Sequence, residues 1–264
     1  MWTRVGAIVL RQGLLYRRSG PRLAEMFYWP VIDVLVWSFL SLYLRRLENP
    51  GAGVRAGAAI VGALILWDIL FRSQQSVAMA FLEDVWSRNL LNVFASPIRP
   101  AEYVVGGIVA GIIKVTGAAA VAALIAWGLI GFNILSIGLH LFVFVANLLV
   151  MGWAIGIVTM ALILYFGEGA EVLAWALSFA FQPLSAVFYP VSVLPQPFRA
   201  IAHGIPASHV FEGMRSVLAG RGLPLDELAW AVGLNVVYVL AATLFFAWMF
   251  DLVRTKGLLT KFGE

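Results

Sequence analysis

The chain has 264 residues, of which 62% are hydrophobic and only 12% are charged. A soluble fold of this length could not bury so much apolar surface, so the composition excludes a soluble globular domain and a disordered chain and indicates an all-α protein that crosses a membrane several times. Cysteine is absent, which excludes disulfides and cysteine-bound zinc, and the net charge of +4 is interpreted by its location along the chain rather than as a nucleic-acid surface.

The first segment, residues 2–22, has the pattern of a helix that lies in the membrane interface. Arg4, Arg11 and Arg18 recur every seven residues, which places them nearly on one face of a helix, with apolar side chains towards the opposite face. Such a pattern is typical of an amphipathic helix at a lipid surface. Glycine 20 and proline 21 are expected to end it.

Six apolar segments follow, each long enough to cross about 30 Å of hydrocarbon at about 1.5 Å per residue. They are residues 27–44, 56–81, 103–130, 137–166, 172–188 and 228–250. Lysine and arginine are more frequent in the segments that share a side with the N-terminus than in those on the other side. The positive-inside rule therefore predicts a multi-pass protein of the inner (plasma) membrane with both termini in the cytoplasm.

The connection between the second and third spans, residues 82–96, is long and amphipathic. Its apolar residues lie at helical spacing with polar residues between them, which predicts a short cytoplasmic helix. Two interpretations are open: a contact for a soluble partner, or an interfacial helix that only caps the bundle. The candidate contact residues are Glu83, Asp84, Trp86, Arg88 and Asn89.

The outer connection, residues 189–224, is rich in proline yet still apolar. Prolines at this density do not allow a straight helix, so we predict short broken helices that dip into the membrane from its outer side. The residues singled out in this segment are Tyr189, Pro190, Pro195, Pro206 and Arg215.

Polar residues inside the predicted spans are candidates for a substrate pathway. Asp68 and Arg72 lie four residues apart and face the same way on a helix, and Asp33 is a lone acid in the first span. Gln74 and Gln75 follow directly and extend the polar face. The alternatives are an intrahelical pair of Asp68 and Arg72 that satisfies itself, and a helix contact made by Asp33.

Two further patterns concern packing and metal binding. The pairs Gly107/Gly111 and Gly152/Gly156 allow helices to approach closely, either within one subunit or at the seam of a dimer. Histidines 203 and 209 lie six residues apart without a ligand pattern, so we interpret them as polar residues of a surface turn and predict no metal site.

Three stretches carry a resemblance to a known family: residues 96–103 (SPIRPAEY), 182–191 (QPLSAVFYPV) and 211–215 (FEGMR). They resemble the type-2 permeases of ABC transporters, and the likeness extends over almost the whole chain. The resemblance implies a permease that dimerises, binds two cytoplasmic ATPase subunits, and exports amphipathic drugs, lipids or lipid-linked glycans. The acidic loop at Glu168 and Glu171 departs from the basic residue expected there.

The sequence therefore predicts a single permease domain, residues 1–264, that is not itself an enzyme. It contains no phosphate-binding motif G-x-x-x-x-G-K-[ST], so ATP and magnesium would be bound by the partner ATPase, and no cofactor is expected on this chain. The expected partners are two ATPase copies, a second copy of itself and membrane lipids, with no nucleic acid. The alternatives are a membrane-embedded lipid-modifying enzyme and an ATPase-independent channel or scaffold.

Overall fold

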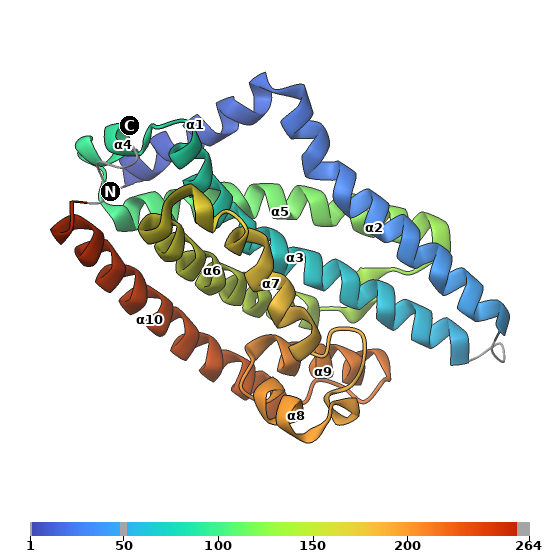
Figure 1. Ribbon diagram of the computed structural model, residues 1–264. Helices are drawn as coiled ribbons and strands as arrows, with labels where there is room; N and C mark the ends of the chain where they lie inside the picture. Colours follow the sequence, from blue (N-terminus) through green and yellow to red (C-terminus); the bar gives the residue numbers. More distant parts are fainter. Residues whose placement is uncertain (1, 48–51, 258–264) are drawn as a thin grey trace.

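The computed structural model describes residues 2–47 and 52–257, and within these ranges every regular element is a helix. Long helices run side by side along the bundle, and short helices gather at its two ends (Figure 1). The all-helical fold predicted from the composition is confirmed.

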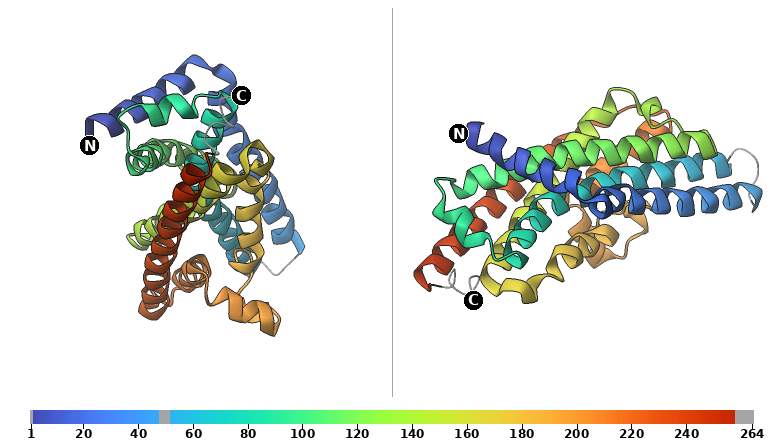
Figure 2. Two further views of the ribbon diagram at one scale, coloured as in Figure 1. Left: turned by 60° about the vertical axis from the view of Figure 1, so that its left-hand side comes forward. Right: turned by 90° about the horizontal axis from the view of Figure 1, so that it is seen from above.

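Helix α1 (Trp2–Arg18) and helix α2 (Gly20–Leu47) meet at a single non-helical residue, Ser19, one residue from the predicted break. Helix α1 packs on α5 (Pro100–Ile130) and lies across one end of the bundle (Figure 2). A lysine of α5 fastens it there: Lys114 Nζ donates to Gln12 Oε1 at 3.1 Å and lies over the ring of Tyr16.

Helix α3 (Ala52–Trp86) occupies the centre, packed against α2, α5 and α6 (His140–Phe166). Glycines allow this close packing: a Cβ at Gly152 would lie 1.8 Å from Ser73 Oγ, and one at Gly111 would lie 2.2 Å from Ser76 Oγ. Ser73 also donates to the backbone carbonyl of Leu149 on α6. The two glycine pairs therefore serve packing within one chain.

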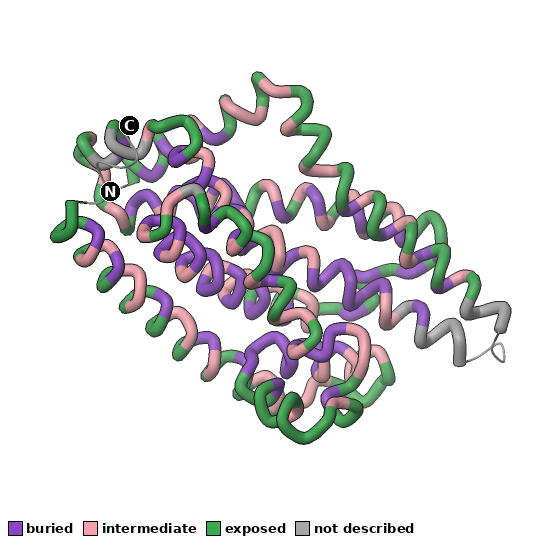
Figure 3. Tube along the Cα trace, in the orientation of Figure 1, coloured by how far each residue is buried: buried purple, intermediate pink, exposed green. Residues whose placement is uncertain are grey.

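Helices α3 and α6 contribute more buried residues than the other elements, and these residues lie at the centre of the bundle (Figure 3). Helix α10 (Leu225–Thr255) covers α6. Its outer face carries exposed apolar side chains, as do the outer faces of α2 and α5. Exposed apolar faces around a buried core are expected of a helical bundle that is surrounded by the hydrocarbon of a membrane.

Four described helices are long and apolar enough to cross a membrane: α2 within Gly20–Tyr43, α5, α6 and α10. The predicted fifth span contains helix α7 (Leu173–Leu184), which has only 12 residues and is preceded by the 3-10 turn η2 (Gly167–Ala170) at the acidic loop. The predicted boundary at residue 82 is wrong, because α3 continues to Trp86 and a separate helix, α4 (Leu90–Ala95), follows.

The proline-rich segment forms short broken helices, as predicted. They are η3 (Val191–Val193), α8 (Gln196–Ala202) and α9 (Pro206–Leu218), and another 3-10 turn, η1 (Ile134–Ile137), joins α5 to α6. Helices α8 and α9 lie at the opposite end of the bundle from α1 and α4 (Figure 1). The prolines begin these elements: Pro190 and Pro195 precede η3 and α8, and Pro206 is the first residue of α9.

Candidate functional site

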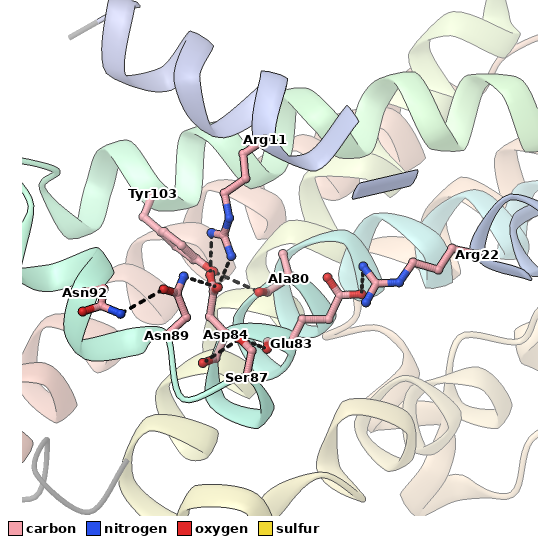
Figure 4. Close-up of polar contacts among 9 residues, drawn as sticks. All are labelled: Arg11, Arg22, Ala80, Glu83, Asp84, Ser87, Asn89, Asn92 and Tyr103. Carbon is pink, nitrogen blue, oxygen red and sulfur yellow. Dashed lines mark hydrogen bonds and ion pairs between the residues drawn. The ribbon is translucent and has the colours of Figure 1, made fainter. Parts of the chain in front are cut away.

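Three ion pairs link the N-terminal segment to the region around α4. Arg4 Nη1 lies 3.3 Å from Glu102 Oε2, Arg11 pairs with Asp84, and Arg22 Nη1 lies 3.5 Å from Glu83 Oε1. Two of these pairs are visible in Figure 4. Three arginines of the segment expected at a lipid surface therefore face carboxylates of α3 and α5.

Asp84 is the polar centre of this region and has no exposed surface. Its carboxylate accepts hydrogen bonds from Arg11 Nη1 at 3.0 Å, from the Tyr103 hydroxyl at 2.6 Å and from Asn89 Nδ2 at 3.1 Å. The hydrogen bond to Asp84 raises the pKa of Arg11, which stays charged. Asp84, which we expected to touch a partner, instead joins α1, α3 and α5 from the interior.

The end of α3 has the hydrogen bonds of a Schellman motif. The Asn89 N–H donates to the Asp84 carbonyl at 2.9 Å, and the Arg88 N–H donates to the Val85 carbonyl at 3.0 Å. Arg88 takes the left-handed conformation, with φ of 52°, that such a motif requires at this position. The chain therefore reverses sharply in what we call the α3–α4 turn, residues 86–89.

The predicted contact residues divide between surface and interior. The side chains of Trp86, which is 44% exposed, and Arg88 lie on the surface of the α3–α4 turn. Glu83 and Asn89 are half-buried, and they are held by Arg22 and Asp84, respectively. The geometry thus presents an aromatic ring and a guanidinium on a rigidly anchored turn.

A second polar feature runs along the middle of α3. Between residues 61 and 82, every residue of this helix is buried except five that share one face, which we call the α3 stripe: Asp68, Phe71, Arg72, Gln75 and Met79. Asp68 Oδ2 accepts from Arg72 Nε at 2.7 Å. The predicted intrahelical pair is therefore present, on the one partly open face of a central helix.

The other predicted pathway residues lie in different places. Gln74 is fully buried and bonds to Thr159 and to the carbonyl of Ala174 on α7, so it packs inside the bundle rather than along the stripe. Gln75 Nε2 also donates to Ala174, at 2.7 Å. Asp33 is exposed on α2, near enough to Arg72 for their charges to attract, since α2 packs against α3.

At the opposite end, Arg215 fastens α9 to the turn after α7. Its guanidinium donates to the carbonyl of Ala186 at 2.9 Å and to Glu212 Oε1 at 3.0 Å. The same Glu212 oxygen accepts from the Val191 N–H at 2.7 Å. Tyr189 donates to the Pro183 carbonyl at 2.6 Å. Glu212 was not among the predicted residues, although its spacing from Arg215 allows this pair.

His209 corrects another sequence interpretation, because it is buried rather than part of a surface turn. Its Nδ1 lies 2.5 Å from Glu227 Oε2 of α10, and its Nε2 lies 3.0 Å from the carbonyl of His203. It therefore joins α8, α9 and α10. Over residues 2–47 and 52–257, no three histidine or acidic side chains gather closely enough to hold a metal ion.

Comparison with protein families matches residues 4–219 to the family described as ABC-2 type transporter. The match includes the three ion pairs, the α3–α4 turn, the α3 stripe and the Glu212–Arg215 pair. Comparison with curated proteins gives no match. Because the family match covers more than half of the chain, and because long apolar helices accompany it, the chain belongs to the ABC-2 type transporter family and is a membrane subunit of a transporter.

Proposed function

We propose that this chain is the permease subunit of an ATP-driven exporter that moves an amphipathic substrate outward across the plasma membrane. Two copies would assemble with two cytoplasmic ATPase subunits, which bind ATP and magnesium. The observation that carries the proposal is the exposed pair Trp86 and Arg88 on a turn anchored by buried Asp84, in a chain of this family.

The arrangement of the two ends supports a consistent topology. The chain then crosses the membrane six times, and α1 lies along the inner surface. The crossings are α2, α3, α5, α6, α7 together with the turn that follows it, and α10. Helix α1, helix α4 and the C-terminal end of α10 lie at one end of the bundle, and α8 and α9 lie at the other (Figure 1). With the first end in the cytoplasm, the α3–α4 turn meets the ATPase and acts as the coupling segment.

The central position of α3 supports a route for coupling. A push on the α3–α4 turn acts on a 35-residue helix whose middle is packed tightly against α6 and α5 through glycines. The ion pairs of Asp84 and Glu83 extend the same push to α1 and to the start of α2. Movement of α3 relative to α2 would then open or close the face that carries the α3 stripe.

The test is reconstitution of the chain with the ATPase that copurifies with it. We expect ATP hydrolysis only when both chains are present, and uptake of substrate into inside-out vesicles only with hydrolysable ATP. Robust hydrolysis by the isolated chain, or uptake at the same rate without ATP, would contradict the proposal.

Thiol labelling tests the topology separately. The chain has no cysteine, so single cysteines at Asn92 and Gly222 report without background. From outside the cell, an impermeant maleimide should label the cysteine at Gly222 and leave the one at Asn92 unlabelled until the membrane is opened. The reverse pattern would invert the model.

A further inference from the structure

Asp33 lies near the middle of a membrane-spanning helix. The apolar part of α2 is Gly20–Tyr43, which places Asp33 about 20 Å from its start at about 1.5 Å per residue. It is exposed, and no hydrogen bond or ion pair joins its carboxylate to the residues that the structure describes. An ionised side chain at this depth is costly unless it pairs or faces a wet path.

The charges around Asp33 do not balance. Arg72 Nε bonds to Asp68 Oδ2 at 2.7 Å, so the one guanidinium in the middle of the packed helices α2 and α3 is already paired, and Asp33 leaves one formal negative charge over. No other charged residue occurs in residues 26–43 of α2 or in residues 61–82 of α3. Lys114, on the neighbouring α5, is held by Gln12 and Tyr16 of α1.

The remaining polar atom on the α3 stripe is also an acceptor. Gln75 Oε1 is buried and receives no hydrogen bond from the described part of the chain, since the amide nitrogen is the atom that bonds to Ala174. A ligand that carries a positive charge or N–H donors would satisfy the exposed Asp33 carboxylate, and the Gln75 oxygen adds a further acceptor rather than a donor on α3. An anionic ligand would meet Arg72 only beside both carboxylates.

Aromatic side chains lie on the same helices as these acceptors. Trp29 and Trp37 lie one helical turn before and after Asp33, and Trp29 is exposed. On the other side, the ring of Phe71 contacts the rings of Trp175 and Phe179 on α7, at centroid distances of 6.3 and 5.4 Å. Aromatic faces attract cations and also cover the apolar body of an amphipathic ligand.

We propose that the face formed by Asp33 and the α3 stripe selects a cationic amphipathic substrate, with Asp33 as the residue that sets the preferred charge. This proposal rests on the proposed export function, because it treats the open face of α3 as part of the substrate path. It assigns a positive charge to that substrate. It also gives Asp33 and Asp68 different roles, because the Asp68 carboxylate is already paired with Arg72.

The test uses two probes of the same shape and opposite charge, tetraphenylphosphonium and tetraphenylborate. The full chain is placed in nanodiscs of phosphatidylcholine, and saturable binding is measured for the wild type, for Asp33→Asn and for Asp251→Asn. Asp251 is an exposed acid on α10 and serves as the matched control. We expect Asp33→Asn to weaken tetraphenylphosphonium binding at least tenfold, to leave tetraphenylborate binding unchanged or stronger, and Asp251→Asn to change neither.

Several results would overturn the proposal: no saturable phosphonium binding by the wild type, a change under twofold in Asp33→Asn, or an equal loss for both probes. Loss of a dimer in Asp33→Asn, seen as a halved protein mass in detergent, would show that Asp33 faces a second copy of the chain instead. Because binding is measured without the ATPase, these failures leave the proposed export function standing. Normal Asp33-dependent binding without any ATP-driven transport would remove the export function alone.

Discussion

Helices α3 and α9 end in the same backbone turn, at opposite ends of the bundle. In α9, the Arg221 N–H donates to the Ser216 carbonyl and the Gly220 N–H donates to the Val217 carbonyl, which repeats the pattern made by Asn89 and Arg88 in α3. The left-handed position is Gly220, with φ of 76°, in α9, whereas it is Arg88 in α3. Glycine adopts this conformation readily, but for a residue with a Cβ it is less favourable by about 1–2 kcal/mol of free energy.

The difference indicates what each turn is for. The turn of α9 uses the residue that the backbone favours. The turn of α3 keeps a strained arginine, exposed beside Trp86 and anchored through Asp84. Strain that the surrounding structure maintains is common at functional sites, which supports the proposal that this turn presents a side chain to the ATPase. The following predictions test this contrast, from the largest expected effect to the smallest.

Removal of the Asp84 carboxylate should cause the largest loss of stability. Asp84→Ala leaves Tyr103, Asn89 and the half-buried Arg11 without their shared acceptor, so we expect the free energy of unfolding to fall by about 2–4 kcal/mol. Ser216→Ala, at the equivalent position of α9, should change it by under about 0.5 kcal/mol. Thermal unfolding in detergent checks both variants, and equal losses would contradict the special role of Asp84.

Exchange of the left-handed residues should have opposite signs at the two turns. Arg88→Gly relieves backbone strain and should stabilise the chain by up to about 1 kcal/mol, while Gly220→Ala should destabilise it by about 1 kcal/mol. Arg88→Ala keeps the strain and removes only the side chain. If the arginine serves the partner, both Arg88 variants should lower ATP-driven transport alike, despite their different melting temperatures.

The outermost ion pair should contribute least. Arg22 and Glu83 are partly exposed and 3.5 Å apart, so Arg22→Ala should cost under about 1 kcal/mol of stability. Raising the salt concentration should shrink that cost further, since exposed pairs are screened. A cost as large as that of Asp84→Ala would mean that the three ion pairs act as one buried unit.

Much of the helical layout follows from the sequence, because long apolar runs can only be helices in a membrane. The end of α3 could not be predicted in the same way. The residue that ends it is an arginine rather than the expected glycine, so residues 82–86 read as the start of a new helix. The proline-rich outer segment was predictable because proline acts locally, through its own ring and its missing N–H.

The contacts of the site were less predictable, because they join residues far apart in the chain. Arg11 and Asp84 are separated by 73 positions, and His209 and Glu227 by 18. The seven-residue spacing relates Arg4 and Arg11, which both make ion pairs, but it did not identify the carboxylates that they contact. In the same way, Gln74 and Gln75 are adjacent in sequence, yet only Gln75 lies on the open face of α3.

The central claim is that the α3–α4 turn binds the ATPase, and its most direct test compares two exposed tryptophans. Trp86 lies on this turn, and Trp248, which is 60% exposed, lies on α10. With the purified ATPase titrated onto each variant in nanodiscs, Trp86→Ala should raise the Kd at least tenfold, as loss of an aromatic anchor does, while Trp248→Ala should leave it unchanged. An unchanged Kd for Trp86→Ala, accompanied by a lower melting temperature, would contradict the claim and identify the segment as an interfacial cap.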